Sequence, residues 1–116
     1  MNGKEIRLVR RKAYESLCHA QAKKGVTMED YKKWSREVDQ KITLAQAGIR
    51  KFEVYEIEGS EEGIPPFDIV EVIEVDSWET LKKIENNEKM KKFLAEEWMK
   101  KWVDKGSLVN IYGNKI

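Results

Sequence analysis

The sequence predicts an α+β fold with the ferredoxin-like element order β-α-β-β-α-β, a four-stranded antiparallel sheet with helices on one face. Four stretches have the alternation and β-branched composition of strands, and two regions have helical periodicity, in that order along the chain. The 116 residues are enough for one domain with a modest core.

The central strand of this sheet is predicted at residues 67–75, between Pro65-Pro66 and Asp76-Ser77. Both of its alternating side-chain sets are apolar: one has Phe67, Ile69, Ile73 and Val75, and the other has Val70 and Val72. A strand that is apolar on both sides is covered on both faces. We therefore expect helices on one face of the sheet and a partner subunit on the other.

The other strands are predicted at residues 13–22, 51–58 and 108–112. In the first, one side-chain set is small, which predicts close approach by another layer. Strand 51–58 joins the central strand through a loop at 59–66, as a wide antiparallel hairpin.

Two helical regions follow from capping residues and apolar spacing. Thr27 to Asp30 matches a capping box, and a helix is predicted to run to about Ala45 and end at Gly48. Its predicted buried stripe is Met28, Tyr31, Trp34, Val38 and Ile42. Ser77 is predicted to cap a short second helix, Asn86-Asn87 to break it, and Gly106 to end the longer helix that follows.

Composition limits the partners of the chain. Charged residues make up 37% of it, yet the net charge is only +1, which argues against nucleic-acid or membrane-surface binding. A single cysteine rules out an internal disulfide and favours a reducing compartment, and no apolar run approaches the ~18 residues of a spanning helix. We expect a cytoplasmic protein with a basic N-terminal extension at residues 1–12 and one domain at 13–116.

The sheet face without helices would leave a large apolar patch exposed in a monomer. Face-to-face pairing of two copies through this open face would bury it, so the sequence predicts a homodimer.

Three stretches carry a family resemblance: residues 25–34 at the start of the first helix, the strand 67–75, and Met90 with the Leu94-Ala-Glu-Glu-Trp98 run and Val103-Asp104. Over roughly residues 13–115 the chain resembles the RedY-like proteins, a family of dimeric α+β barrels. The resemblance implies a homodimer with a pocket between each sheet and its helices or partner, and it leaves the chemistry open because the superfamily hosts many activities.

Glu71 is the leading catalytic candidate, since a carboxylate among apolar strand residues has a raised pKa that suits acid–base work near neutral pH. The alternative is a carboxylate paired with a neighbouring Lys or Arg. His19 is the only histidine, and its strand is expected beside the central one. A His19–Glu71 dyad is therefore a hypothesis, and an ordinary structural histidine is the alternative.

The candidate ligand-binding residues are Tyr55, Trp34, Tyr112 and Glu74. Each has an ordinary alternative: a buried tyrosine with one partner, a core tryptophan, or an ion-paired carboxylate. Adjacent strand residues point to opposite faces, so Cys18 and His19 are not expected to form a thiol–imidazole pair. No spacing of ligands predicts a metal site, and no glycine-rich loop predicts a nucleotide, so no cofactor is expected.

Three functions remain open at this point. The first is a small enzyme without a cofactor that binds and transforms an apolar or aromatic molecule by acid–base chemistry. The second is a binding or stress-protective module of the same fold with no chemistry. The third is a monooxygenase of the haem-degrading or quinol-oxidising kind, which would need His19 or a quinol-like substrate.

Overall fold

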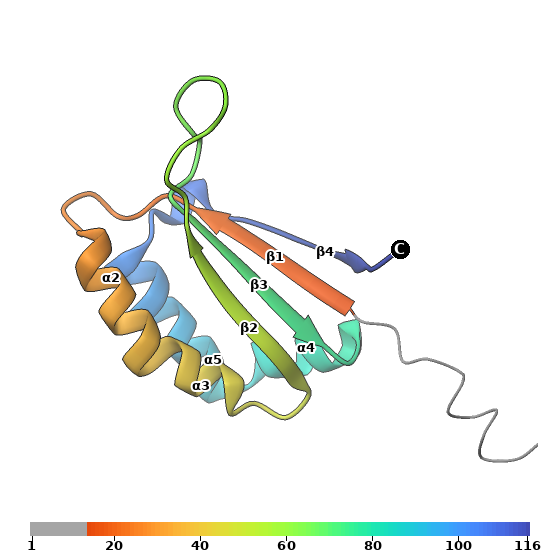
Figure 1. The fold of residues 1–116 in the computed structure, drawn as a ribbon. Helices are drawn as coiled ribbons and strands as arrows, with labels where there is room; N and C mark the ends of the chain where they lie inside the picture. The colour runs from red at the N-terminus through yellow and green to blue at the C-terminus, as the bar shows by residue number, and fades with distance from the viewer. Residues whose placement is uncertain (1–13) are drawn as a thin grey trace, which may run out of the picture.

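The structure, a computed structural model, describes residues 14–116, so the predicted extension at residues 1–12 lies outside the described part. Four strands form one antiparallel sheet in the order β2-β3-β1-β4 (Figure 1). They are β1 (Tyr14–Ala20), β2 (Ile49–Glu56), β3 (Ile69–Val75) and β4 (Val109–Asn114). The predicted strands are confirmed, with β1 and β3 in the centre of the sheet.

Two helical segments cover one face of the sheet (Figure 1). The first consists of α2 (Met28–Trp34), the π-helical η1 (Ser35–Asp39) and α3 (Gln40–Leu44). The second consists of α4 (Trp78–Asn86), α5 (Glu88–Phe93) and the π-helical η2 (Leu94–Trp102), followed by a 3₁₀ turn, η3 (Lys105–Ser107). The element order confirms the predicted β-α-β-β-α-β fold.

The predicted helix starts are made by capping side chains. Thr27 Oγ1 accepts a hydrogen bond from the backbone N–H of Asp30 at 3.1 Å, and Ser77 Oγ accepts one from Thr80 at 3.1 Å. Asn87 Oδ1 caps α5 by accepting from the N–H of Lys89 at 3.0 Å, which explains the break between α4 and α5. These bonds satisfy amide groups that a helix leaves without internal partners.

Gly48 lies in the turn that separates α3 from β2. Its φ of +94° lies in the left-handed region, and a Cβ there would come within 2.3 Å of Thr80 Cγ2. Backbone conformation and close packing on α4 therefore both require glycine at this position. The prediction that Gly48 ends the first helical segment is consistent with this turn.

Strand pairing decides which side chains share a face. Glu71 is paired with Cys18 on β1 and with Val54 on β2, and all three face the helices. Val70, one residue earlier, is paired with His19 and Tyr55 on the opposite, open face. The predicted alternation of β3 is confirmed for the residues from Ile69 to Val75.

The start of β3 differs from the prediction. Phe67 lies outside the strand and stacks on the His19 ring with 4.3 Å between ring centroids, so its predicted place in the same side-chain set as Ile69 is wrong. Asp68 holds the chain at this point, because its N–H donates to the Ala20 carbonyl and its Oδ2 accepts from the N–H of Ala22. The β2–β3 connection is correspondingly long and projects beyond the sheet (Figure 1).

The end of the second helical segment also differs. The helix ends at Trp102 because Val103 adopts extended backbone and forms a bridge with Ala22. Gly106 lies in the following 3₁₀ turn, so its predicted role as the helix end is wrong.

The buried face of the first helical segment is shifted by one residue from the predicted stripe. Tyr31 is buried as predicted, but the other buried positions are Ser35, Asp39 and Thr43. In a regular α-helix, residues four positions apart are rotated by about 40° from one another around the helix axis. The wider turns of η1 reduce that rotation, so all four side chains face the sheet.

Candidate functional site

A cavity of about 100 Å³ lies between the helix-facing side of the sheet and the helices. Its wall combines polar residues from the sheet and the helices with large apolar side chains. Cys18, Asp39 and Glu71 supply polar groups, while Phe52 and Trp98 are among the apolar residues. Three carboxyl groups, those of Asp39, Glu71 and Glu85, therefore line the same largely apolar space, and the first two are buried.

Glu71 stands in the middle of β3 and is only 6% exposed. The Tyr31 hydroxyl donates a hydrogen bond to Glu71 Oε2 at 3.0 Å, and it accepts one from the Trp98 indole Nε1 at 3.1 Å. One side chain from each helical segment thus fixes the orientation of the carboxyl.

Asp39 lies at the end of η1 and is 3% exposed. Thr43, one turn further on, donates to Asp39 Oδ1 through its hydroxyl at 3.3 Å. No Lys, Arg or His side chain lines the cavity among the described residues, so neither carboxyl has a cationic neighbour in that wall.

Burial without a cationic partner raises the pKa of both groups. The pKa of Glu71 rises to about 8, mainly through desolvation and then through the nearby charge of Asp39, while the bond from Tyr31 lowers it. Desolvation raises the pKa of Asp39 to about 6, against the bond from Thr43. At neutral pH the pair together holds about one proton, which it can donate or exchange.

Cys18 is a free, buried thiol beside Glu71 on the neighbouring strand. Desolvation, followed by the charges of Glu71 and Asp39, raises its pKa far above the ordinary thiol value. The side chain therefore stays protonated and does not act as a thiolate nucleophile. His19 is on the opposite face, as strand alternation predicts.

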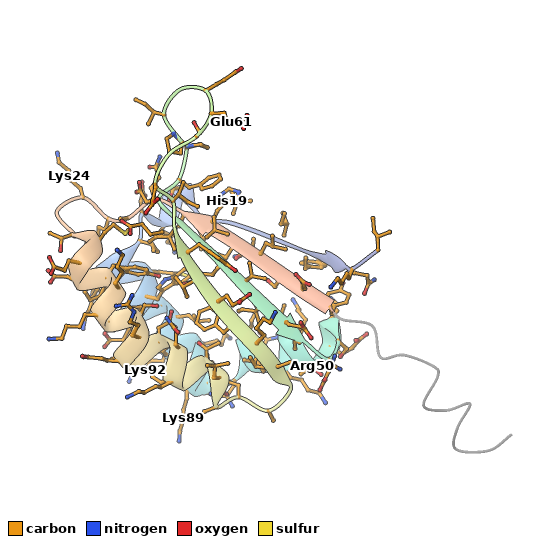
Figure 2. The ribbon with its side chains drawn as sticks, viewed as in Figure 1. His19, Lys24, Arg50, Glu61, Lys89 and Lys92 are labelled. Atoms are coloured by element: carbon orange, nitrogen blue, oxygen red, sulfur yellow. The ribbon has the colours of Figure 1, made fainter. Side chains whose placement is uncertain are left out.

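The predicted His19–Glu71 dyad is wrong in its geometry. The register pairs Glu71 with Cys18 and His19 with Val70, which places the two side chains on opposite faces of the sheet. His19 lies near the end of β1 that adjoins the projecting loop (Figure 2). Its Nδ1 is buried and has no hydrogen-bond partner among the described residues.

The predicted ligand-binding residues do not gather around Glu71. Tyr55 and Glu74 lie on the open face, where Tyr55 is 48% exposed and Glu74 forms an ion pair with Arg50 at 3.8 Å. Tyr112 is on the helix-facing side of β4, where it stacks on Trp78 with 3.8 Å between centroids.

Trp34 is also outside the cavity wall. It stacks between Phe93 and Trp102, at centroid distances of 5.9 and 5.2 Å, and so joins the two helical segments. None of the four predicted ligand-binding residues lines the cavity. Whether they contact a ligand elsewhere on the protein stays a prediction.

Sequence reasoning missed Asp39, Tyr31 and Thr43 as site residues. In the sequence these three residues and Ser35 follow one another at intervals of four residues through the first helical region, which is the pattern that could have grouped them on one face. Polar residues at that spacing indicate a solvent face in most helices, so the pattern alone did not reveal a buried site.

Two observations limit the other kinds of site. Among residues 14–116, no group of three or more His, Cys, Asp or Glu side chains is arranged to hold a metal ion. In the same range, every helix is too short or too polar to cross a bilayer.

The four-stranded sheet with helices on one face and a cavity between the layers defines a small protein of the ferredoxin-like fold. A family model described as REDY-like protein HapK matches residues 16–116. The chain belongs to this family, which confirms the resemblance. No curated protein sequence matches it.

Solved structures support the fold. The crystal structure of HapK from Hahella chejuensis is 15% identical and superposes with a TM-score of 0.67, covering 88% of this chain and 92% of that one. A dimeric ferredoxin-like protein of unknown function from Thermobifida fusca is 11% identical, with a TM-score of 0.68, covering 91% and 93%. Hydroxynitrile lyase from Passiflora edulis is 9% identical, with a TM-score of 0.70, covering 92% and 96%.

Proposed function

We propose that this protein is a homodimeric REDY-like enzyme that binds a small apolar or aromatic molecule in the cavity and transforms it by acid–base chemistry without a cofactor. The observation that carries this is the Glu71 carboxyl: 6% exposed, in an apolar wall, beside a second buried carboxyl. A group with a pKa near the working pH is well suited to give and take a proton.

The dimer is argued from the open face. Its central residues are apolar, and Ile111 and Val109 are 54% and 44% exposed on the outer strand β4. The unpartnered, buried Nδ1 of His19 lies on the same face. A second copy seated there would remove the apolar patch from water. The similar protein from Thermobifida fusca is described as dimeric, which supports the proposal of a dimer.

Glu71 has the supports that an acid–base group needs. Tyr31 and Trp98 hold the carboxyl in one orientation, and Asp39 supplies a nearby negative charge that keeps the proton on the pair. The similar structure from Passiflora edulis, named as a lyase, supports the view that this fold accommodates an enzyme. We also propose a cytoplasmic location, because a free thiol such as that of Cys18 is typical of a reducing compartment.

The test begins with native mass spectrometry of the purified protein, to identify a bound small molecule. Turnover of that molecule is then followed for the wild type, Glu71→Gln and the control Glu96→Gln, which removes an exposed carboxylate from η2. We expect Glu71→Gln to lose at least about a hundredfold in kcat with the dimer intact, within the usual range for a general acid or base. Unchanged turnover would remove Glu71 from the mechanism.

A ligand that binds without being changed, and that Glu71→Gln still binds, would instead identify a binding module of the same fold. The haem-degrading alternative is weakened by position, since His19, the only histidine in the sequence, does not line the cavity. An absorbance scan after haem titration tests that alternative directly.

A further inference from the structure

We infer that the cavity takes a small apolar amine, bound as its ammonium ion between Asp39 and Glu71. This inference rests on the proposed function, because it names the ligand class of the same cavity. It depends on three properties of the wall: the sign of its charges, its unused hydrogen-bond acceptors, and its apolar surface.

The charges in the wall are all of one sign. Asp39, Glu71 and Glu85 line the cavity, and no described Lys, Arg or His side chain does. Two buried carboxyls without a cation resist ionisation, since each charge loses its hydration and repels the other. An ammonium group would supply the missing positive charge, whereas a carboxylate ligand would meet only like charge.

Each buried carboxyl also has one oxygen without a donor. Glu71 Oε2 is bonded by Tyr31 and Asp39 Oδ1 by Thr43, but no described residue donates to Glu71 Oε1 or Asp39 Oδ2. Neither oxygen is among the buried side-chain atoms without a partner, so both reach accessible space, where the donors of a ligand can take the place of water. An ammonium group has three donors and no acceptor, which matches a wall of acceptors.

The rest of the wall suits a hydrocarbon body. Phe52, Leu81, Met90 and Trp98 line the cavity beside the carboxyls. An engineered apolar cavity of about 150 Å³ binds benzene, so this one, at about 100 Å³, suits a slightly smaller ring or branched chain. The body of the ligand would bury apolar area while its nitrogen reaches the carboxyls.

The titratable groups around Glu71 set the pH dependence. Asp39 faces it from η1, Tyr31 from α2 and Cys18 from β1, while Glu85 from α4 lines the same cavity. Near neutral pH the carboxyl pair holds about one proton, which ammonium binding would displace. Amine affinity should therefore rise with pH from about 6 to 8, by at most about tenfold per unit.

The experiment compares three branched molecules of four carbons each: isobutylamine, isobutanol and isobutyrate. Each is titrated into the full chain by calorimetry near neutral pH. We expect the amine to bind at least about tenfold more tightly than the alcohol, as charge-assisted hydrogen bonds allow, and the carboxylate to bind most weakly. Calorimetry in two buffers of different ionisation enthalpy should show proton release with the amine and none with the alcohol.

Asp39→Asn keeps the shape of the wall and removes one charge. It should weaken amine binding by at least about tenfold, toward that of the alcohol, while the exposed control Glu96→Gln leaves the affinity for both molecules as in the wild type. Equal binding of amine and alcohol to the wild type would overturn the amine class but keep an apolar binding cavity. If the amine does not bind at all, the inference fails, and the proposed function is judged separately by turnover in Glu71→Gln.

Discussion

The two faces of the sheet differ in which residues depart from the usual pattern, because the covered face includes buried polar groups and the open face includes uncovered aliphatic ones. On the covered face, the row across the sheet through Glu71 also holds Cys18, and the buried polar residues Asp39 and Thr43 come down from the helices. On the open face, Val72 and Leu17 pair in the central strands without a covering helix. Chain folding alone thus buries carboxyls and leaves aliphatic side chains uncovered.

This contrast separates two tasks. The covered face holds titratable groups away from water, where desolvation shifts their pKa values enough to be useful. The open face would supply association energy in the proposed dimer, since apolar area would be removed from water if a second copy bound there. Each face can be perturbed from its own side of the sheet, so the contrast is open to direct tests.

The largest effect is expected from a charge on the open face. Val72→Lys would place an ammonium group at the centre of the proposed dimer interface, beside Glu53 of β2, where the charge loses its hydration on association or drives the copies apart. We expect the dimer dissociation constant to rise by about a hundredfold or more, equivalent to roughly 3 kcal/mol. Sedimentation equilibrium over a range of concentrations measures it.

The matched control for that variant is Asn86→Lys, which adds the same charge at the exposed end of α4. It should leave the dissociation constant within about twofold of the wild type, because exposed charges contribute little. A wild type that sediments as a 13.6 kDa species at micromolar concentration would refute the dimer itself.

The next effect concerns the covered face and stability. A carboxyl whose pKa is raised from 4.5 to about 8 on folding binds its proton more tightly in the folded state than in the unfolded one. Stability therefore falls as pH rises from about 4.5 to 8, by at most about tenfold per pH unit in the unfolding equilibrium constant. Asp39 acts in the same direction over the lower window from 3.8 to about 6.

Glu71→Gln keeps the side-chain shape and removes this titration. In urea denaturation series at pH 5, 6, 7 and 8, we expect the variant to gain stability relative to the wild type at each step. The difference should be largest at pH 8, where the wild type has begun to lose its buried proton. Parallel stability curves for the two proteins would mean that Glu71 is not desolvated in solution.

The fold was predictable because its signals are local. Thr27 and Ser77 cap their helices as the sequence indicates, and the alternation of β3 assigns Ile69 and Val70 to opposite faces. These features depend on residues only a few positions apart, which is the range over which capping and periodicity act. Glu71 was selected as a candidate for the same reason, as a polar residue in an apolar strand.

The rest of the site was not predictable, because it depends on contacts between distant residues. The register of β1 against β3 places Glu71 opposite Cys18 rather than His19. This register cannot be predicted from the residues of either strand alone. Phe67 leaves the strand to stack on a residue 48 positions earlier in the chain (67 − 19). The π-helical turns of η1 bring Asp39 onto the buried face. Such turns are rare, so an analysis of apolar spacing that assumes a regular α-helix does not include them.

The smallest effect is expected at the hydroxyl that links the helices to the carboxyl. Tyr31→Phe removes the donor to Glu71 Oε2 and leaves the Trp98 indole N–H without its acceptor, in a buried setting. We expect a loss of about 1–3 kcal/mol in unfolding free energy from the orphaned groups. Because the Tyr31 bond lowers the pKa of Glu71, its removal should also raise the carboxyl titration midpoint, followed by ¹³C NMR. Lost stability with an unmoved midpoint would make Tyr31 a packing residue, whereas a raised midpoint identifies it as the group that positions and tunes Glu71.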